Sequence, residues 1–204
     1  TGIAPLDMKT TTRAGGSPEH GLTGAAVTQV AHAYGVPSLC GGFDATASVP
    51  GTQAALEQFA SGLSLVLGGA DLICGIGLLE DARTLWLEQL FIDDEMVNMI
   101  RRIADGVVVD DEHLALDVIE KVGIGGTFLG QRHTMDHLRR EHFLPKLVDR
   151  RSHDLWAADG RKPIEERARA EVVHALARPV PHPLPAAVAT ELRSLIDDAR
   201  SAAS

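Results

Sequence analysis

The sequence predicts an α/β protein in which short parallel strands alternate with longer helices. Two apolar runs, residues 38–43 and 71–76, each contain a cysteine and at least one glycine. Each run follows a stretch with helical character, residues 20–34 and 53–67. Short buried strands that alternate with longer helices are typical of parallel βα units. Because the loops after parallel strands converge on one face, we expect functional residues at the strand ends.

The composition is that of a folded protein with an acidic balance. The 204 residues are 45% hydrophobic and carry a formal net charge of −9, which allows one sizeable domain or two small ones. The best basic cluster, residues 139–151, is interleaved with acidic residues, so a solvated face or protein dock is favoured over a nucleic-acid site. The apolar runs are too short to span a membrane, and no signal segment is apparent. Two cysteines without CxxC spacing favour reduced thiols, so we expect a cytoplasmic protein.

The first part of the chain reads as successive strands and helices. Residues 2–8 are expected to form a strand. After a loop, Ser17 is placed to cap the first helix, and Gly35 is placed to end it. The two apolar runs then flank a second helix over residues 52–68, which predicts a strand–helix–strand unit.

The following part is predicted to be mostly helical. Residues 80–104 carry an apolar stripe that the acidic residues 93–95 interrupt, which indicates either one helix or two. A short apolar segment, residues 107–109, is a fourth strand candidate, and the acidic residues after it favour a helix over residues 111–121. Further helices are expected over residues 134–141, 162–176 and 185–203.

These elements predict βα units over residues 1–143 and a helical extension over residues 144–204. Four strand candidates cannot close an eight-stranded barrel. Either the sheet is open, or further strands lie upstream of residue 1. We favour the second interpretation because the chain opens with Thr1 at the edge of an apparent strand.

A series of short motifs runs through almost the whole chain. They are Gly16-Ser17-Pro18-Glu19, Tyr34-Gly35-Val36-Pro37, Gly69-Ala70-Asp71-Leu72-Ile73, Gly77-Leu78-Leu79-Glu80, residues 88–95, residues 114–119, Gly125-Gly126-Thr127-Phe128-Leu129, and His133-Thr134 with His137, Arg139 and Glu141. In this order the motifs resemble the C-terminal part of the trimethylamine methyltransferase (MttB) family.

The resemblance implies a (βα)8 TIM-type barrel, of which this chain is the C-terminal portion. It also implies an enzyme that moves a methyl group from a methylated amine to the Co(I) of a corrinoid, in one-carbon metabolism similar to methanogenesis. The corrinoid (cobalamin) is carried by a separate partner protein, so the chain is expected to bind no cofactor directly. We also expect a homo-oligomer.

The expected substrate class follows from one difference between this chain and the family's trimethylamine enzymes. The family's trimethylamine enzymes use pyrrolysine near the strand that this chain places at residues 38–46. Here that stretch holds only standard residues, among them Cys40, Phe43 and Asp44. The resemblance therefore points to members without pyrrolysine, such as those that act on glycine betaine or other quaternary amines.

Charged and apolar side chains recur at the predicted strand ends and on the first loop. Carboxylates or aromatic faces can hold a methylated cation, and in-line placement of its methyl group favours transfer. One carboxylate at such a position is usually a helix cap or loop residue, but recurrence at successive strand ends favours a site. The residues expected to act in catalysis are Glu19, His20, Asp44 and Glu80, and those expected to bind substrate are Asp7, Met8 and Phe43.

A metal site is the less favoured interpretation of one histidine motif. His133, His137 and Glu141 recur every four residues, a spacing that can hold a metal on one helix face. A zincin helix, however, needs Glu directly after the first His, where this chain has Thr134. A hydrogen-bonded structural face is favoured, and no metal is expected.

Other motifs are incomplete. A corrinoid-carrying D-x-H-x-x-G motif would begin at Asp111, but Leu116 stands where glycine is needed. The glycines at residues 75–77 do not extend to G-x-G-x-x-G, and no G-x-S-x-G elbow occurs. The chain is therefore not expected to carry the corrinoid, bind a dinucleotide or act as a serine hydrolase.

Two alternatives to the methyltransferase stay open. The chain could be a non-catalytic scaffold or an assembly fragment of a barrel protein. It could also belong to a TIM-type lyase or aldolase, which would need a lysine at a strand end or a phosphate-binding glycine loop, and only Lys9 comes near.

Overall fold

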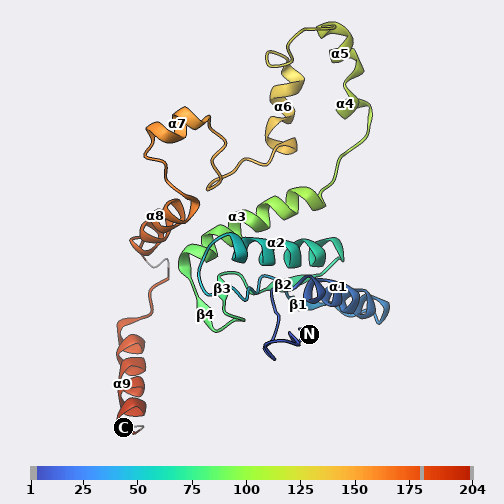
Figure 1. Cartoon of the computed structure of the whole chain (residues 1–204). Coiled ribbons are helices and arrows are strands. Elements are labelled where there is room, and N and C mark those ends of the chain that lie inside the picture. Colours follow the sequence, from blue (N-terminus) through green and yellow to red (C-terminus); the bar gives the residue numbers. More distant parts are fainter. Residues whose placement is uncertain (1–3, 180–181, 203–204) are drawn as a thin grey trace. The chain divides into compact units, whose positions relative to one another are not determined.

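The computed structural model describes residues 4–179 and 182–202 (Figure 1). The chain divides into two compact units, Thr1–Val172 and Val173–Ser204. The division falls within helix α8 (Ile164–Leu176), and the second unit contains helix α9 (Ala186–Ala202). The boundary near residue 144 stays a prediction.

The predicted strand–helix–strand unit is confirmed. Strands β1 (Leu39–Gly41) and β2 (Leu72–Cys74) pair in parallel, and helix α2 (Thr52–Leu67) connects them. The register places Cys40 opposite Ile73. Both strands are shorter than expected because the chain leaves the sheet directly after Gly41. The backbone N–H groups of the next two residues, Gly42 and Phe43, both donate to the Cys74 carbonyl, and this ends the regular ladder.

Small residues allow helix α1 (Pro18–Ala33) to lie close against α2. A Cβ atom at Gly24 would lie 2.5 Å from Cδ2 of the buried Leu65, so a side chain there would collide with α2. The predicted start of α1 is confirmed, because the Ser17 hydroxyl accepts from the backbone N–H of His20. Gly35, with φ of +69°, follows the helix as expected.

The core lies beneath the strands, between α2 and helix α3 (Leu87–Ala104). Phe43, Met96 and Ile100 form its buried centre, and apolar side chains of α2 and β2 pack around them. A second cluster joins α3 to the following chain, where Ile92 packs against Leu147 and Ala168. Burial of these faces stabilises the sheet and fixes the strand ends above it.

The first predicted strand is wrong over the residues that the structure describes. Only one isolated bridge forms, between Leu6 and Arg13, while residues 2–3 lie outside the described part. The Asp7 carboxylate accepts from the backbone N–H groups of Lys9 and Thr10, and this turns the chain back on itself.

The helix expected from residue 80 begins seven residues later. A hairpin comes first, made of β3 (Leu78–Leu79) and β4 (Thr84–Leu85). Three consecutive residues in its turn, 80–82, have φ between +53° and +67°, a region that side chains disfavour. The backbone N–H groups of residues 80 and 81 donate to the carbonyls of Ala47 and Ala45, and these bonds offset the strain.

One helix, α3, forms where the sequence left open one helix or two, and it continues through the acidic residues 93–95. Asp93 is fully buried and Glu95 is 3% exposed. Both carboxylates are hydrogen-bonded, and Glu95 accepts from the backbone N–H groups of residues 146–148. The acidic residues therefore connect α3 to neighbouring segments.

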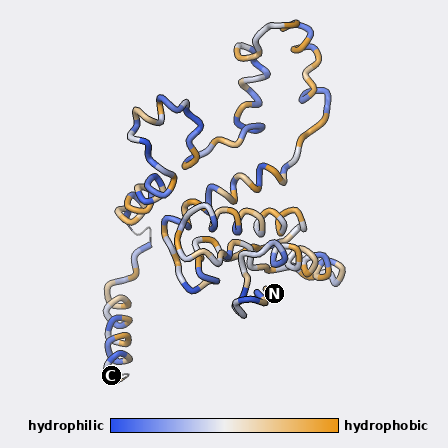
Figure 2. Tube along the Cα trace, viewed as in Figure 1, coloured by the Kyte–Doolittle hydropathy of each residue, from blue (hydrophilic) through white to orange (hydrophobic). Residues whose placement is uncertain are grey.

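The strand expected at residues 107–109 is wrong. These residues form no strand, and Val107 is 81% exposed. The remaining helices are α4 (Asp111–Leu114), α5 (Leu116–Val122), α6 (Arg132–Glu141) and α7 (His153–Ala158). Ala115, with φ of +48°, separates α4 from α5, so the helix predicted over 111–121 is split in two. Hydrophobic residues mark this segment (Figure 2), yet many are exposed, among them Leu129 at 82%.

The described part of the chain is thus mixed helical and α/β with few strands. Its parallel sheet has two strands, and a closed barrel stays a prediction. None of the described helices is long and apolar enough to cross a membrane.

Candidate functional site

The carboxyl ends of β1 and β2 bring together an arginine and two aspartates that are far apart in sequence. Nη2 of Arg13 lies 2.6 Å from Oδ2 of Asp44, and Nη1 of Arg13 lies 3.5 Å from Oδ1 of Asp81. The Asp44 side chain is only 8% exposed. We call Arg13, Asp44 and Asp81 the strand-end cluster. One guanidinium faces two carboxylates, so the cluster has a net negative charge.

Gly75 makes room for this cluster at the end of β2. Its φ of +113° is one that side chains rarely adopt. A Cβ atom there would lie 2.9 Å from Oδ1 of Asp44 and 3.2 Å from the backbone N of Phe43. The glycine therefore lets the two strand ends approach each other.

His20 lies beside the same strand end. It is 1% exposed, and its Nδ1 lies 2.6 Å from the Gly15 carbonyl oxygen. A Cβ atom at Gly41 would have Oδ2 of Asp44 at 3.5 Å and Cε1 of His20 at 3.8 Å. The backbone N–H of Gly15 donates to Asp81. His20 and Asp44, both expected at the site, are thus neighbours around the end of β1.

The other expected site residues lie in different surroundings. The Glu80 carboxylate accepts from the Thr84 hydroxyl at 2.6 Å, across the hairpin. Glu19 is exposed in the first turn of α1, and Met8 is 85% exposed. Hydrogen bonds from the backbone N–H groups of Thr10 and Lys9 lower the pKa of Asp7. The Phe43 ring is buried in the core with Met96 and Ile100.

A buried network holds both strand ends from below. The Gln58 side-chain amide donates to the Phe43 carbonyl at 2.8 Å and to the Leu78 carbonyl at 3.2 Å. The Asp93 carboxylate accepts from the backbone N–H of Gly77 at 2.6 Å and from Gln89 at 2.7 Å. Burial raises the pKa of Asp93 to about 6, although these donors oppose the shift. We call Gln58, Gln89 and Asp93 the buried network.

Sequence reasoning missed Arg13, Asp81, Glu57 and the buried network. Glu57, on α2, accepts from the backbone N–H and hydroxyl of Thr46, and its carboxylate leaves no room for a side chain at Gly16. The one sequence feature that could have indicated this cluster was the presence of Arg13 in the loop that leads to α1. Its partners lie 31 and 68 residues away, which no local pattern reveals.

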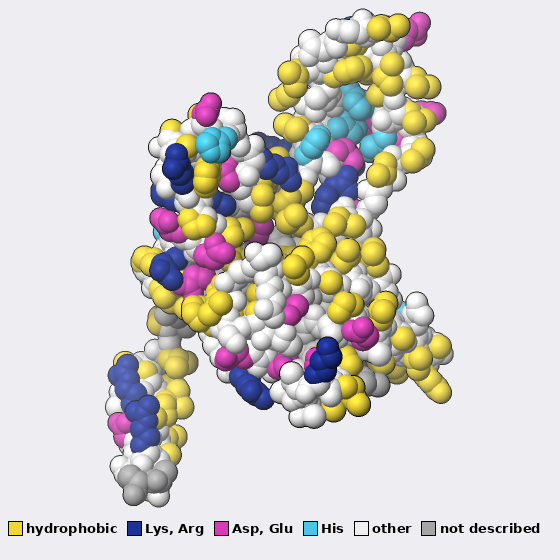
Figure 3. Space-filling view, viewed as in Figure 1, with side chains coloured by type: hydrophobic (Ala, Val, Ile, Leu, Met, Phe, Trp, Pro, Cys, Tyr) yellow, Lys and Arg dark blue, Asp and Glu magenta, His cyan; other side chains and the backbone are white. Residues whose placement is uncertain are grey.

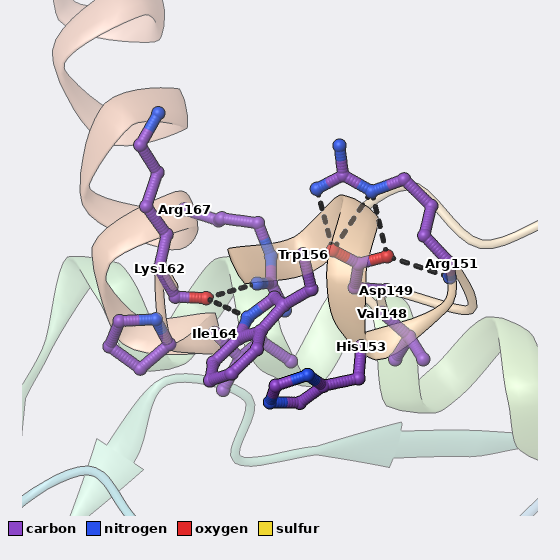
Figure 4. Close-up of a pocket in the computed structure, with 9 residues that line it drawn as sticks. Val148, Asp149, Arg151, His153, Trp156, Lys162, Ile164 and Arg167 are labelled. Atoms are coloured by element: carbon purple, nitrogen blue, oxygen red, sulfur yellow. Dashed lines mark hydrogen bonds and ion pairs between the residues drawn. The ribbon is translucent and has the colours of Figure 1, made fainter. Parts of the chain in front are cut away.

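A cavity of about 410 Å³ lies beside α7 (Figure 4), and all of its lining residues come from residues 148–167. Its charged side chains already have partners. Arg151 pairs with Asp149, whose pKa falls to about 2 through the hydrogen bonds from Arg151. Arg167 and the Trp156 ring N–H both donate to the Lys162 carbonyl. The cavity therefore offers little unpaired charge to a ligand.

Among the described residues, no three His, Cys, Asp or Glu side chains are arranged to hold a metal ion.

The fold and these contacts define an α/β protein whose candidate site lies where parallel strands end. A sequence model of the family described as "Trimethylamine methyltransferase (MTTB)" matches residues 3–203, and the chain belongs to this family. The family expected from the motifs is confirmed.

The chain is similar to relatives named trimethylamine methyltransferase and to one named glycine betaine methyltransferase. It is 39% identical over 193 residues to the trimethylamine methyltransferase MttB of Desulfitobacterium hafniense, covering 95% of this chain and 39% of the relative. It is 36% identical to MttB1 of Methanosarcina mazei, covering 97% and 40%. It is 34% identical to a glycine betaine methyltransferase of Desulfitobacterium hafniense, covering 93% and 40%. The chain thus spans about two fifths of the length of these relatives.

Proposed function

We propose that this chain contributes to an enzyme that transfers a methyl group from a methylated amine to the Co(I) of a corrinoid carried by a separate protein. The observation that carries the proposal is family membership over residues 3–203, together with the methyltransferase names of the relatives. The strand-end cluster supports a cationic substrate, because its two carboxylates share one guanidinium. The expected homo-oligomer belongs to the same proposal.

A quaternary amine is the proposed substrate class. Residues 38–46 contain only standard amino acids, in the stretch where the family resemblance places pyrrolysine. A quaternary ammonium has no proton to lose, so the protein has to hold the cation and aim one methyl group. Identity alone does not choose the substrate, since trimethylamine and glycine betaine relatives match at similar levels.

Each expected site residue has a role in this proposal. Asp44 and Glu80 supply negative charge near the bound cation, and the buried His20 fixes the loop that carries Arg13. Phe43 forms the apolar floor beneath the strand ends. Asp7, Met8 and Glu19 lie on the adjoining loop and helix start, where they would contact the substrate from outside.

The corrinoid belongs to the partner in this proposal. When bound, its Co(I) supplies the nucleophile that accepts the methyl group. The chain's nearest match to a corrinoid-carrying motif is incomplete, because Leu116 stands where that motif needs glycine. We therefore assign no corrinoid ligand to this chain, and its residues are proposed only to bind and orient the amine.

The test mixes the protein with Co(I) cobalamin and a panel of methylated amines and follows the visible spectrum. Conversion to methyl-cobalamin with one quaternary amine supports the proposal and names the substrate. Asp44→Asn should reduce conversion at least tenfold, whereas Asp94→Asn, an exposed aspartate on α3, should not. Absence of conversion with every amine, in a folded protein, would favour the scaffold alternative.

A further inference from the structure

Three histidines gather between α4 and α6, apart from the strand-end cluster (Figure 3). The ring centroids of His113 and His137 are 5.2 Å apart with planes at 83°, and those of His133 and His137 are 4.0 Å apart and stacked. His137 is 9% exposed. We call His113, His133 and His137 the histidine cluster.

The hydrogen bonds on one side of each ring fix where the protons lie. Nδ1 of His137 is 2.9 Å from the His133 carbonyl oxygen, which can only accept, so Nδ1 donates. Nδ1 of His113 is 2.6 Å from Oδ1 of Asp110. Hydrogen bonds from the His113 backbone and ring lower the pKa of Asp110, so this oxygen also accepts. A neutral imidazole carries one N–H, so both Nε2 atoms would then hold only a lone pair.

Those two Nε2 atoms face carboxylates. Nε2 of His137 lies 3.3 Å from Oε1 of Glu112, and Nε2 of His113 lies 3.6 Å from Oε1 of Glu141. Both nitrogens are buried and have no hydrogen-bond partner among the described residues. Lone pairs that face carboxylate oxygens repel each other, whereas a proton on each nitrogen would convert the contacts into ion pairs.

We propose that His113 and His137 form a pH-dependent clamp, in which protons on their Nε2 atoms join α4 to α6 through Glu112 and Glu141. The clamp also reaches α3, because Nη2 of Arg102 lies 3.2 Å from Oε2 of Glu141. The third histidine also links the two helices, since Nε2 of His133 donates to the Glu112 carbonyl at 2.7 Å.

The segment that contains α4, α5 and α6 has few other contacts to stabilise it, so the clamp should affect its stability. Helix α4 has four residues and α5 has seven, too short to be stable alone. Several apolar side chains of the segment are exposed, including Leu116 at 67% and Ile119 at 51%, so packing holds it weakly. Stability from a histidine that gains partners when protonated is present at low pH and is lost as pH rises. The segment over residues 110–141 should therefore open when the two Nε2 atoms lose their protons.

Hydrogen exchange of the 204-residue chain at pH 6 and pH 8 tests the clamp, with rates corrected for intrinsic exchange. Protons on both Nε2 atoms would add two ion pairs between α4 and α6, so amides in residues 110–141 should be several-fold better protected at pH 6. The double variant His113→Gln/His137→Gln should lose this dependence. The control His142→Gln, an exposed histidine just after α6, should keep it.

A variant of one of the two glutamates should keep the segment protected at high pH. In Glu112→Gln the amide N–H can donate to the neutral Nε2 of His137, so protection should persist at pH 8. Nitrogen NMR of the wild-type imidazoles provides a direct readout, with both nitrogens of His113 and His137 protonated at pH 6. A bare Nε2 on both rings at pH 6 would overturn the proposal. So would an unchanged pH dependence in the double variant, or protection at pH 8 that needs zinc and that a chelator removes.

Discussion

The buried network and the histidine cluster both contain buried polar atoms, but the partners of these atoms differ. In the network, the Asp93 carboxylate meets N–H donors from Gly77, Gln89 and Gln58. In the histidine cluster, two ring nitrogens meet carboxylates that cannot donate. A buried acceptor that receives hydrogen bonds from several donors holds its surroundings in one structure. Two acceptors that lie next to each other repel, and the contact becomes favourable only when a proton binds between them. The comparison explains why the first region can position a site and the second can respond to pH.

Removing the acceptor at the centre of the network should have the largest effect on stability. Asp93→Ala leaves the backbone N–H of Gly77 buried without this partner and removes one acceptor from each of the Gln58 and Gln89 amides, which should cost about 3–5 kcal/mol. Urea unfolding measures the loss. Asp93→Asn keeps an acceptor of the same shape and should cost less. Equal stability of the alanine variant and the wild type would remove the network from this account.

The same residue should give a pH dependence of stability with a defined sign. The pKa of Asp93 is raised to about 6 in the folded state, above the ordinary value of about 3.9 in an unfolded chain. The folded state therefore binds the extra proton between these values, and its contribution to stability falls as pH rises through this window, by at most about 3 kcal/mol.

Comparing two variants separates this effect from the histidine clamp. Asp93→Asn cannot titrate and should flatten the difference in unfolding free energy between pH 4 and pH 6, while leaving the change in exchange of residues 110–141 between pH 6 and pH 8. His113→Gln/His137→Gln should do the opposite. Identical pH profiles in both variants would contradict the distinction between the two regions.

Gly75, beside the strand-end cluster, should be sensitive to substitution. An alanine there has to adopt φ of +113° with its Cβ atom 2.9 Å from Asp44, which should cost about 1–3 kcal/mol. Gly35→Ala is the matched control, because that glycine also has positive φ but has no atom within 4 Å of the added Cβ. A larger loss in Gly35→Ala would show that the close approach of the strand ends matters little.

The helix cap before His20 should have the smallest effect. Ser17→Ala removes the hydroxyl that accepts from the backbone N–H of His20, at a cost of about 1 kcal/mol. Thermal unfolding measures it, and Ser17→Asp should restore the lost stability. Full stability of the alanine variant would mean that Pro18 and the packing of α1 alone determine the helix start.

The parallel unit could be predicted from sequence because its signal is local. The apolar runs around Cys40 and Cys74 are bounded by helices, and the first of these helices carries its start and stop residues, Ser17 and Gly35, in the sequence itself. The position of Asp44 at a strand end follows from the same pattern. Features that lie within one element, or at its border, can be recognised from the order of the amino acids alone.

The rest depends on contacts between distant residues. The hairpin after β2 places three non-glycine residues at positive φ, and the carbonyls of Ala45 and Ala47 hold them there. Asp93 and Glu95 look like a helix break, but both are buried acceptors for other segments. Arg13 pairs with Asp44 and Asp81, which turns an expected group of free carboxylates into a partly neutralised cluster.

The central claim is that a methylated cation binds where β1 and β2 end. Amide chemical shifts of the isotopically labelled chain, titrated with glycine betaine and with tetramethylammonium, test it most directly. We expect shifts concentrated in residues 42–46 and 75–81, and we expect Asp44→Asn to abolish them. Shifts confined to the cavity beside α7, or a response that Asp44→Asn leaves unchanged, would contradict it.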